Sequence, residues 1–184
     1  MAYASLGELK AYLGITDTAD DELLTQLIDM ATAVIESYTR RVFVAYTKTR
    51  HYGPESINGP VLSLGEWLLS VTELKDGQGN VIPSEGYELL PKGGKRFWGI
   101  RLRPGWQWNC DREHDVTVTG SWGWSETPPP DIVLATLRLA AYFYRQKDAQ
   151  VFDVTAAPGL GTITIPKGMP ADVKLILDQY KEVG

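Results

Sequence analysis

The stretch that most constrains this 184-residue chain runs from Pro128 to Lys147. It opens with three consecutive prolines, and a proline is tolerated in the first turn of a helix, where its missing N–H has no partner to lose. Asp131 follows the prolines, and Arg145 and Lys147 lie near the other end. Because these charges complement the helix dipole at both ends, the stretch predicts one long helix.

Apolar residues occupy nearly every side of this predicted helix. They are Ile132, Val133, Leu134, Ala135, Leu137, Leu139, Ala140, Ala141 and Phe143. A helix that is apolar on all sides is normally buried, and this one is too short, with Arg138 inside it, to cross a membrane. We therefore predict the central helix of a protein core, and we expect no membrane association.

Two helices are predicted before residue 42. Ser5 and Glu8 have the spacing of a capping box, which predicts a short helix over 5–13 that ends at Gly14. A second helix finishes near Arg41, with apolar residues at gaps of three and four. It opens with acidic residues that favour the positive end of the helix dipole and form a candidate acidic surface. They are Asp20, Asp21 and Glu22.

A final amphipathic helix is predicted to begin at Pro170. Its apolar residues fall at positions i, i+3, i+4 and i+7, which places them on one helical face. They are Val173, Ile176, Leu177 and Tyr180. This face predicts docking onto the core or onto a partner.

Between residues 42 and 125 the sequence becomes rich in β-branched and aromatic residues, separated by glycine and proline. This pattern predicts short strands. The predicted strands are 42–52, 69–75, 81–82, 87–90, 96–103 and 116–121. Trp98, Ile100 and Leu102 alternate with polar or small residues, so we expect them on one buried face. The predicted fold is α+β, with a mainly helical core (1–41 and 126–184) and a β-rich insertion (42–125).

Charge is unevenly distributed along the chain. The first 40 residues carry seven acidic and two basic residues, whereas the other 144 carry 16 of each, giving the net charge of −5. No overall basic field attracts nucleic acid by counterion release, so a DNA-binding regulator is disfavoured. An acidic surface is compatible with DNA that passes without binding.

No catalytic or metal-binding constellation stands out. Cys110 and His114 lie close in sequence, but zinc needs three or four ligands, and a polar loop explains the segment better. His51 on a presumed strand is better explained as a solvated edge residue. The chain has one cysteine, which excludes an internal disulfide. We expect neither a cofactor nor a metal, and we expect that the protein is not an enzyme.

Residues 148–168 are predicted to be irregular because they are rich in glycine and proline. Thr162 to Ile165 is compatible with a brief strand. The segment lacks the lysine of a phosphate-binding loop, which disfavours a phosphate site. Its length without regular structure instead predicts a functional or mobile loop. The candidate channel or loop residues are Asp153, Pro158, Gly159 and Gly161.

Four tryptophans occur as two pairs, each separated by one residue. They are Trp106 with Trp108, and Trp122 with Trp124. Both rings of a pair share one face if the backbone is extended. We favour a role in the core or in a protein interface. A carbohydrate-binding module that stacks sugars on exposed rings is the alternative.

Taken in order, these elements resemble the head-tail connector (head completion, or adaptor) proteins of tailed bacteriophages and prophages. Trp106 and Trp108, with Gly120 and Trp122, resemble features of longer members that carry a β-insertion. The helical motifs that carry the resemblance are Leu9-Lys10-x-Tyr12-Leu13, Asp20-Asp21-Glu22-Leu23-Leu24, Ala31-x-x-x-Ile35-Glu36 and Pro170-x-x-Val173-x-x-x-Leu177-x-x-Tyr180.

The resemblance implies a structural role at the head-tail junction of a virion, for a protein made in the bacterial host cytoplasm. It implies a ring, commonly a dodecamer, that binds the portal and a downstream tail-completion protein. DNA passes through the ring without sequence-specific binding. The face formed by Val173, Ile176, Leu177 and Tyr180 is then a candidate portal interface.

Overall fold

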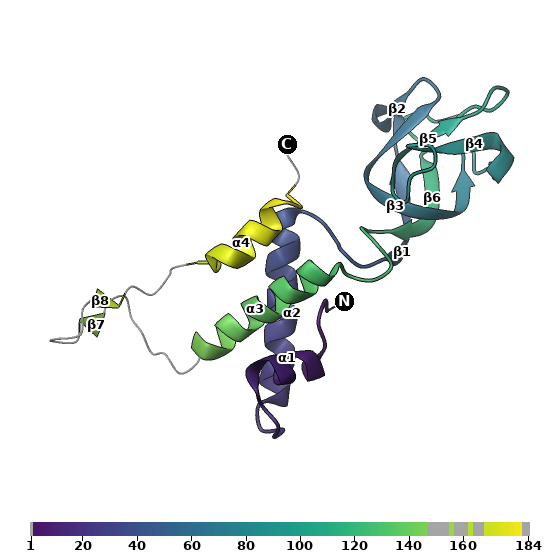
Figure 1. The fold of residues 1–184 in the computed structure, drawn as a ribbon. Coiled ribbons are helices and arrows are strands. Elements are labelled where there is room, and N and C mark those ends of the chain that lie inside the picture. The colour runs from purple at the N-terminus through teal and green to yellow at the C-terminus, as the bar shows by residue number, and fades with distance from the viewer. Residues whose placement is uncertain (1, 147–154, 157–161, 164–167, 182–184) are drawn as a thin grey trace. The chain divides into compact units, whose positions relative to one another are not determined.

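The computed structural model describes residues 2–146, 155–156, 162–163 and 168–181. The chain divides into two compact units, shown in Figure 1. Met1–Arg41 with Pro128–Gly184 form the helical unit, and Val42–Thr127 form the sheet unit. Within the described residues there are four α-helices and a six-stranded antiparallel sheet, so the α+β prediction is confirmed. The expectation of a mainly helical core is not confirmed, because the sheet unit has a hydrophobic core of its own.

The helical unit contains α1 (Leu6–Leu13), α2 (Asp21–Thr39), α3 (Pro130–Gln146) and α4 (Ala171–Asp178). The capping box at the start of α1 is confirmed. The backbone N–H of Glu8 donates to the Ser5 hydroxyl at 3.2 Å, and the Ser5 N–H donates to the Glu8 carboxylate at 2.7 Å. Gly14 ends α1 with a φ of 74°, a conformation that glycine adopts without steric cost.

The apolar stripe of α2 lies in the core of the helical unit, as predicted. Its buried members include Leu24, Leu27, Ile28, Ala31 and Ile35. The expectation that α3 is buried on every side is wrong, because Leu134 is 38% exposed although Ile132 and Leu139 are buried. Contacts with α1, α2 and α4 cover one side of α3, and the strip that contains Leu134 stays uncovered.

The sheet unit contains β1 (Tyr46–Tyr52), β2 (Ile57–Asn58), β3 (Val61–Lys75), β4 (Tyr87–Leu90), β5 (Phe97–Leu102) and β6 (Val116–Trp122), with short 3-10 helices at Pro54–Ser56 and Ser84–Gly86. The strand order is β1-β6-β3-β5-β4, and β2 pairs with the start of β3. β3 is central because its first part pairs with β5 and its last part with β6.

β3 bends where its pairing partner changes. The register shifts between Ser63 and Leu68, and Gly65 within this stretch has a φ of 70°. Such a bulge bends a strand, and glycine tolerates the left-handed conformation. A side chain of β1 reaches the first half of β3, since the Tyr52 hydroxyl donates to the Leu64 carbonyl at 3.1 Å. The sheet therefore folds around its own core.

Several strand predictions differ from the structure. The strand expected over 69–75 begins earlier, at Val61, and the one expected over 42–52 begins at Tyr46. The strand expected at 81–82 is reduced to a single bridge between Val81 and Lys75. The alternation predicts Trp98 on a buried face with Ile100 and Leu102, but Trp98 is 46% exposed whereas the other two are buried. Trp98 has no partner in either neighbouring ladder: the register of β3 against β5 shifts between the partners of Phe97 and Gly99, and the ladder with β4 ends at Gly99.

Within 148–168, β7 (Thr155–Ala156) pairs with β8 (Thr162–Ile163) in an antiparallel ribbon. The predicted strand at 162–165 is thus confirmed at its first two residues. Most of the predicted loop lies outside the described residues, and so do its candidate residues Asp153, Pro158, Gly159 and Gly161.

Candidate interaction surfaces

The four residues proposed as a partner interface, three on α4 and Tyr180 just after it, attach that helix to the helical unit. Val173 and Leu177 are fully buried, and Ile176 and Tyr180 are half-buried. α4 contacts both α2 and α3. A contact of these side chains with the portal stays a prediction. The large apolar residue of α4 that is exposed is Leu175, at 69%, which the helical periodicity missed because it lies outside the predicted stripe.

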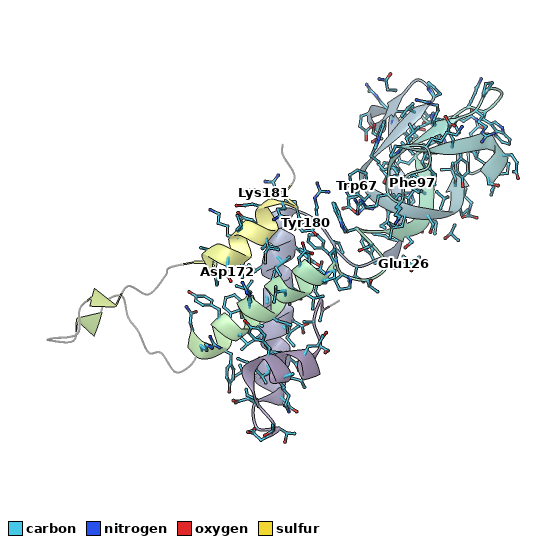
Figure 2. All side chains as sticks on the ribbon, in the orientation of Figure 1. Trp67, Phe97, Glu126, Asp172, Tyr180 and Lys181 are labelled. Carbon is cyan, nitrogen blue, oxygen red and sulfur yellow. The ribbon has the colours of Figure 1, made fainter. Side chains whose placement is uncertain are left out.

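Polar side chains surround the buried face of α4, and Asp172, Tyr180 and Lys181 are labelled in Figure 2. The Tyr180 hydroxyl donates to the Asp131 carboxylate at 2.7 Å, and the Nε of Arg41 donates to the Tyr180 carbonyl at 2.6 Å. Arg138 on α3 forms an ion pair with Asp172 at the start of α4. These contacts tie both ends of α4 to α3 and to the segment after α2.

A tyrosine–carboxylate pair joins α2 to the end of α4. The Tyr38 hydroxyl donates to the Asp178 carboxylate, and this hydrogen bond raises the pKa of Tyr38, because loss of the proton creates a second negative charge beside the first. The ammonium group of Lys181 lies 4.9 Å from the centre of the Tyr38 ring. Both the tyrosine and the carboxylate are therefore engaged within the helical unit.

The predicted acidic surface is only partly free. Asp20 accepts a hydrogen bond from the Tyr144 hydroxyl at 2.5 Å, and Asp21 pairs with the Lys10 ammonium at 2.6 Å. Glu22 is exposed and has no ionic partner among the described residues. Asp29, two turns further along α2, is likewise exposed and was not included in the sequence prediction.

The tryptophan pairs do not present two exposed rings. Trp122 is fully buried and Trp108 is 6% exposed, whereas Trp124 is half-buried and Trp106 is 41% exposed. The Trp106 ring lies against Gly86, where an added Cβ would approach the ring to 2.8 Å. The Trp106 ring therefore packs on the backbone of Gly86, and Trp106 is the exposed member of the two tryptophan pairs.

Trp124 is instead part of a cation–π stack inside the sheet unit. The guanidinium carbon of Arg96 lies 3.7 Å from the centre of the Trp124 ring and 5.9 Å from that of Trp67, which is labelled in Figure 2. A second stack places Arg50 5.0 Å from the Trp122 ring. These arginines therefore serve packing in the sheet unit.

Cys110, His114 and His51 each make local contacts within the sheet unit. Burial raises the pKa of the Cys110 thiol, which disfavours the reactive thiolate. His114 contacts Asp111 at 2.8 Å, and both side chains are exposed. His51 lies 3.3 Å from the Thr117 hydroxyl. Within the described residues, no group of three or more histidine, cysteine or acidic side chains is placed to hold a metal ion.

The one buried carboxylate of the described sheet unit, Asp76, has a structural role. Backbone N–H groups of Gln78 and Asn80 donate to one oxygen, and the amides of Asn80 and Asn109 donate to the other at 3.1 and 2.8 Å. Although burial raises its pKa, the hydrogen bonds from Asn109 and Asn80 outweigh that effect and lower the pKa of Asp76. Four donors fix this carboxylate at the turn.

The N-terminal third of the chain matches a known protein family. The sequence model of the phage gp6-like head-tail connector proteins matches residues 3–64, which include α1, α2 and β1. The resemblance to head-tail connector proteins is confirmed. No curated protein matches the chain in sequence. In the part of the connector-like chain that the structure describes, no helix is long and apolar enough to span a membrane.

Solved structures share the fold over nearly the whole chain. A protein in the neck of a native gene transfer agent (GTA) particle, computed with C12 symmetry, has a TM-score of 0.65 at 17% identity; 99% of this chain and 90% of that chain are covered. The neck of an empty GTA particle, computed with C6 symmetry, gives 0.64 at 19% identity, with 99% and 91% covered. A protein of the native GTA virion gives 0.61 at 18% identity, with the same coverage. This chain thus shares its fold with proteins of GTA necks.

Proposed function

We propose that this chain is a structural protein of a tailed phage or prophage particle and that it forms a ring, of twelve copies, at the head-tail junction. The ring lies between the portal and the tail, extends the DNA channel and completes the head. The main support for this proposal is the connector-family match over residues 3–64. It is joined by the whole-chain likeness to a protein from a GTA neck that was computed with C12 symmetry.

The charge of the chain supports a channel through which DNA passes without sequence-specific binding. The net charge is −5, because 23 acidic residues outnumber 18 basic ones. Carboxylates repel phosphates, whereas non-specific DNA binding needs lysine and arginine to replace condensed counterions. In this proposal the particle is the site of action, and the protein is made in the bacterial host cytoplasm.

The portal and a tail-completion protein are the proposed neighbours of the ring. Contact of Val173 or Leu177 with the portal requires α4 to leave its place on the helical unit, because both side chains are fully buried there. Leu175 needs no such rearrangement, since it is already 69% exposed. We therefore rank Leu175 first among the α4 residues as a portal contact.

A catalytic function is not proposed, and neither is a carbohydrate-binding module. The most polar buried group, Asp76, is saturated by four hydrogen-bond donors, and the burial of Trp108 and Trp122 leaves neither tryptophan pair as a flat platform for a sugar. We infer that the sheet unit serves packing and protein contacts, without a cofactor.

Deletion of the coding sequence from a particle-producing host tests the proposed function. The expected result is packaged heads that lack tails and lose DNA, and expression of the intact chain in trans should restore complete particles. The matched control is a chain with Trp122→Ala, which we expect to fold poorly and fail to restore them. Normal tailed, infectious particles from the deletion host would contradict the proposed function.

A further inference from the structure

The connection between β4 and β5 exposes basic and aromatic side chains. Lys92 and Lys95 are exposed, and among the described residues neither has an acidic partner. Trp98, at the start of β5, is 46% exposed. Arg96 beside them is held by its stack on Trp124 at 3.7 Å, which fixes the base of this connection. We call Lys92, Lys95 and Trp98 the hairpin-tip surface.

The outer side of α2 carries the opposite charge. Glu22 and Asp29 are seven positions apart and therefore share one helical face. Asp17 is exposed just before the helix, and Met30 is 51% exposed beside Asp29. Within the described part of the chain these three carboxylates have no basic partner. We call Asp17, Glu22, Asp29 and Met30 the α2 outer surface.

The two surfaces belong to segments of opposite charge in one chain. Residues 91–108 contain five basic and no acidic residues, whereas the first 40 residues have a net charge of −5. A ring of identical subunits needs two different, mutually complementary patches on each chain. The hairpin-tip surface and the α2 outer surface meet this requirement, because their charges are opposite. Trp98 on the first and Met30 on the second are also complementary, since methionine packs well against aromatic rings.

We propose that the hairpin-tip surface binds the α2 outer surface of a second copy of this chain. This contact rests on the proposed ring and names the residues that close it. Lys92 and Lys95 face the carboxylates of the neighbour and set the register, since charge complementarity gives specificity and rapid association. Trp98 and Met30 supply the apolar centre, in keeping with the enrichment of both residue types at interfaces.

DNA is the other polyanion that a lysine-bearing hairpin attracts, but the charges favour a second copy. The sheet unit as a whole has ten acidic and nine basic residues, so it offers no broad basic field. Affinity for DNA rises with the number of phosphates neutralised, and two lysines neutralise few. A protein neighbour needs only local complementarity, which the α2 outer surface provides.

Paired charge reversals test the contact in the full-length chain. The tip variant is Lys92→Glu with Lys95→Glu, and the α2 variant is Glu22→Lys with Asp29→Lys. Alone, each variant places like charges on both sides of the contact. We expect self-association, measured by sedimentation at low ionic strength, to weaken by about tenfold or more in each. An equimolar mixture should recover the wild-type association, because every contact between the two variants is again between opposite charges.

Matched controls separate this contact from net charge and from misfolding. Arg112→Glu with Lys174→Glu changes the charge as the tip variant does, and Glu113→Lys with Glu126→Lys matches the α2 variant; all four side chains are exposed. Both controls should associate as the wild type does, and circular dichroism should show that every variant is folded.

Three results would overturn the contact: a wild-type chain that stays monomeric at low ionic strength, a tip variant that associates normally, or a mixture that fails to recover. A tip variant that loses binding to duplex DNA but keeps self-association would also overturn it and would assign the hairpin to DNA. The proposed function fails separately, if particles assemble normally without the chain.

Discussion

The helical unit and the sheet unit use their aromatic residues differently. In the helical unit, four tyrosine hydroxyls donate to carboxylates that are distant in sequence. The pairs are Tyr3–Glu36, Tyr38–Asp178, Tyr144–Asp20 and Tyr180–Asp131. In the sheet unit, Arg50 and Arg96 stack on Trp122 and Trp124 around a buried core. The helical unit thus adds several partly exposed hydrogen bonds to its apolar core, whereas the sheet unit concentrates its contacts on a few large rings.

This difference has an energetic consequence. A typical intramolecular hydrogen bond contributes about 0.5–1.5 kcal/mol, whereas removal of a buried aromatic side chain costs about 3–5 kcal/mol. We therefore expect the helical unit to tolerate the loss of any one of these tyrosine–carboxylate hydrogen bonds. We also expect α4 to detach from α2 and α3 stepwise as such bonds are removed. The sheet unit should instead fail when a single central ring is removed.

Each unit has its own spectroscopic signal. All six tryptophans lie in Val42–Thr127, so fluorescence follows the sheet unit. The four described α-helices all lie in the helical unit, so ellipticity at the helical band follows that unit. Denaturant titrations with both signals can therefore compare the two units within one chain.

The largest effect is expected for Trp122→Ala, because this ring is fully buried and its Nε1 donates to the Lys48 carbonyl at 2.9 Å. Its removal should lower the unfolding free energy of the sheet unit by about 3–5 kcal/mol, from the cavity it leaves. Urea titration followed by fluorescence measures the change. Trp106→Ala is the control, since that ring is 41% exposed, and equal losses in both variants would contradict a core organised by Trp122.

A slightly smaller loss of stability is expected for Leu139→Ala in α3, where the side chain is 1% exposed. We expect a loss of about 2–5 kcal/mol from the helical unit, because Leu→Ala in a core removes apolar contacts and leaves a cavity. Helical ellipticity during urea titration is the measurement. Leu134→Ala in the same helix is the matched control, and it should change little because Leu134 is partly exposed. Equal effects would restore the prediction of a helix buried on every side.

Acid should weaken the sheet unit through Asp76. Its pKa is lowered in the folded chain, so its contribution is complete above the unfolded pKa and is lost as pH falls through the folded pKa. Asp76→Asn should remove that pH dependence and cost about 1–3 kcal/mol at neutral pH, because two donors then face an amide nitrogen. Urea titrations by fluorescence across the acid range measure both effects. An unchanged acid slope in the variant would show that Asp76 is not the responsible group.

The smallest effect is expected for Tyr180→Phe, which removes one hydrogen bond to Asp131 and leaves the ring in place. We expect a loss of about 0.5–1.5 kcal/mol in the helical unit. Hydrogen exchange of the α4 amides should become faster, because α4 is held partly by this bond. Tyr12→Phe provides a control at a 44% exposed tyrosine. Unchanged exchange in α4 would mean that the hydroxyl contributes nothing to its attachment.

The locally encoded parts of the fold were readable from the sequence. The Ser5–Glu8 capping box, the Gly14 helix end and the stripe of α2 depend on residues within a few positions of one another, and the structure has all three. Helix α3 was placed correctly, but its exposed side at Leu134 depends on how many helices pack around it. The apolar pattern of the helix itself does not show how many helices pack around it.

Features that depend on strand pairing escaped prediction. The bend at Gly65 and the exposed Trp98 both lie where the register between β3 and β5 shifts. The same distinction between local pattern and packing applies to the candidate interaction surfaces. Periodicity identified Val173 and Leu177 as apolar, but only packing shows that they face the core and that Leu175 faces outward. Likewise, the ties of Asp20 and Asp21 join residues that the sequence leaves far apart.

Electron cryomicroscopy of the head-tail junction, in particles that contain the tagged chain, tests the central proposal most directly. We predict a closed ring of twelve copies between the portal and the tail, with the helical unit and the sheet unit of each copy fitting the density and DNA passing along the axis. Tagged chains found elsewhere in the particle, or a junction complete without them, would contradict the proposed role as a head-tail connector.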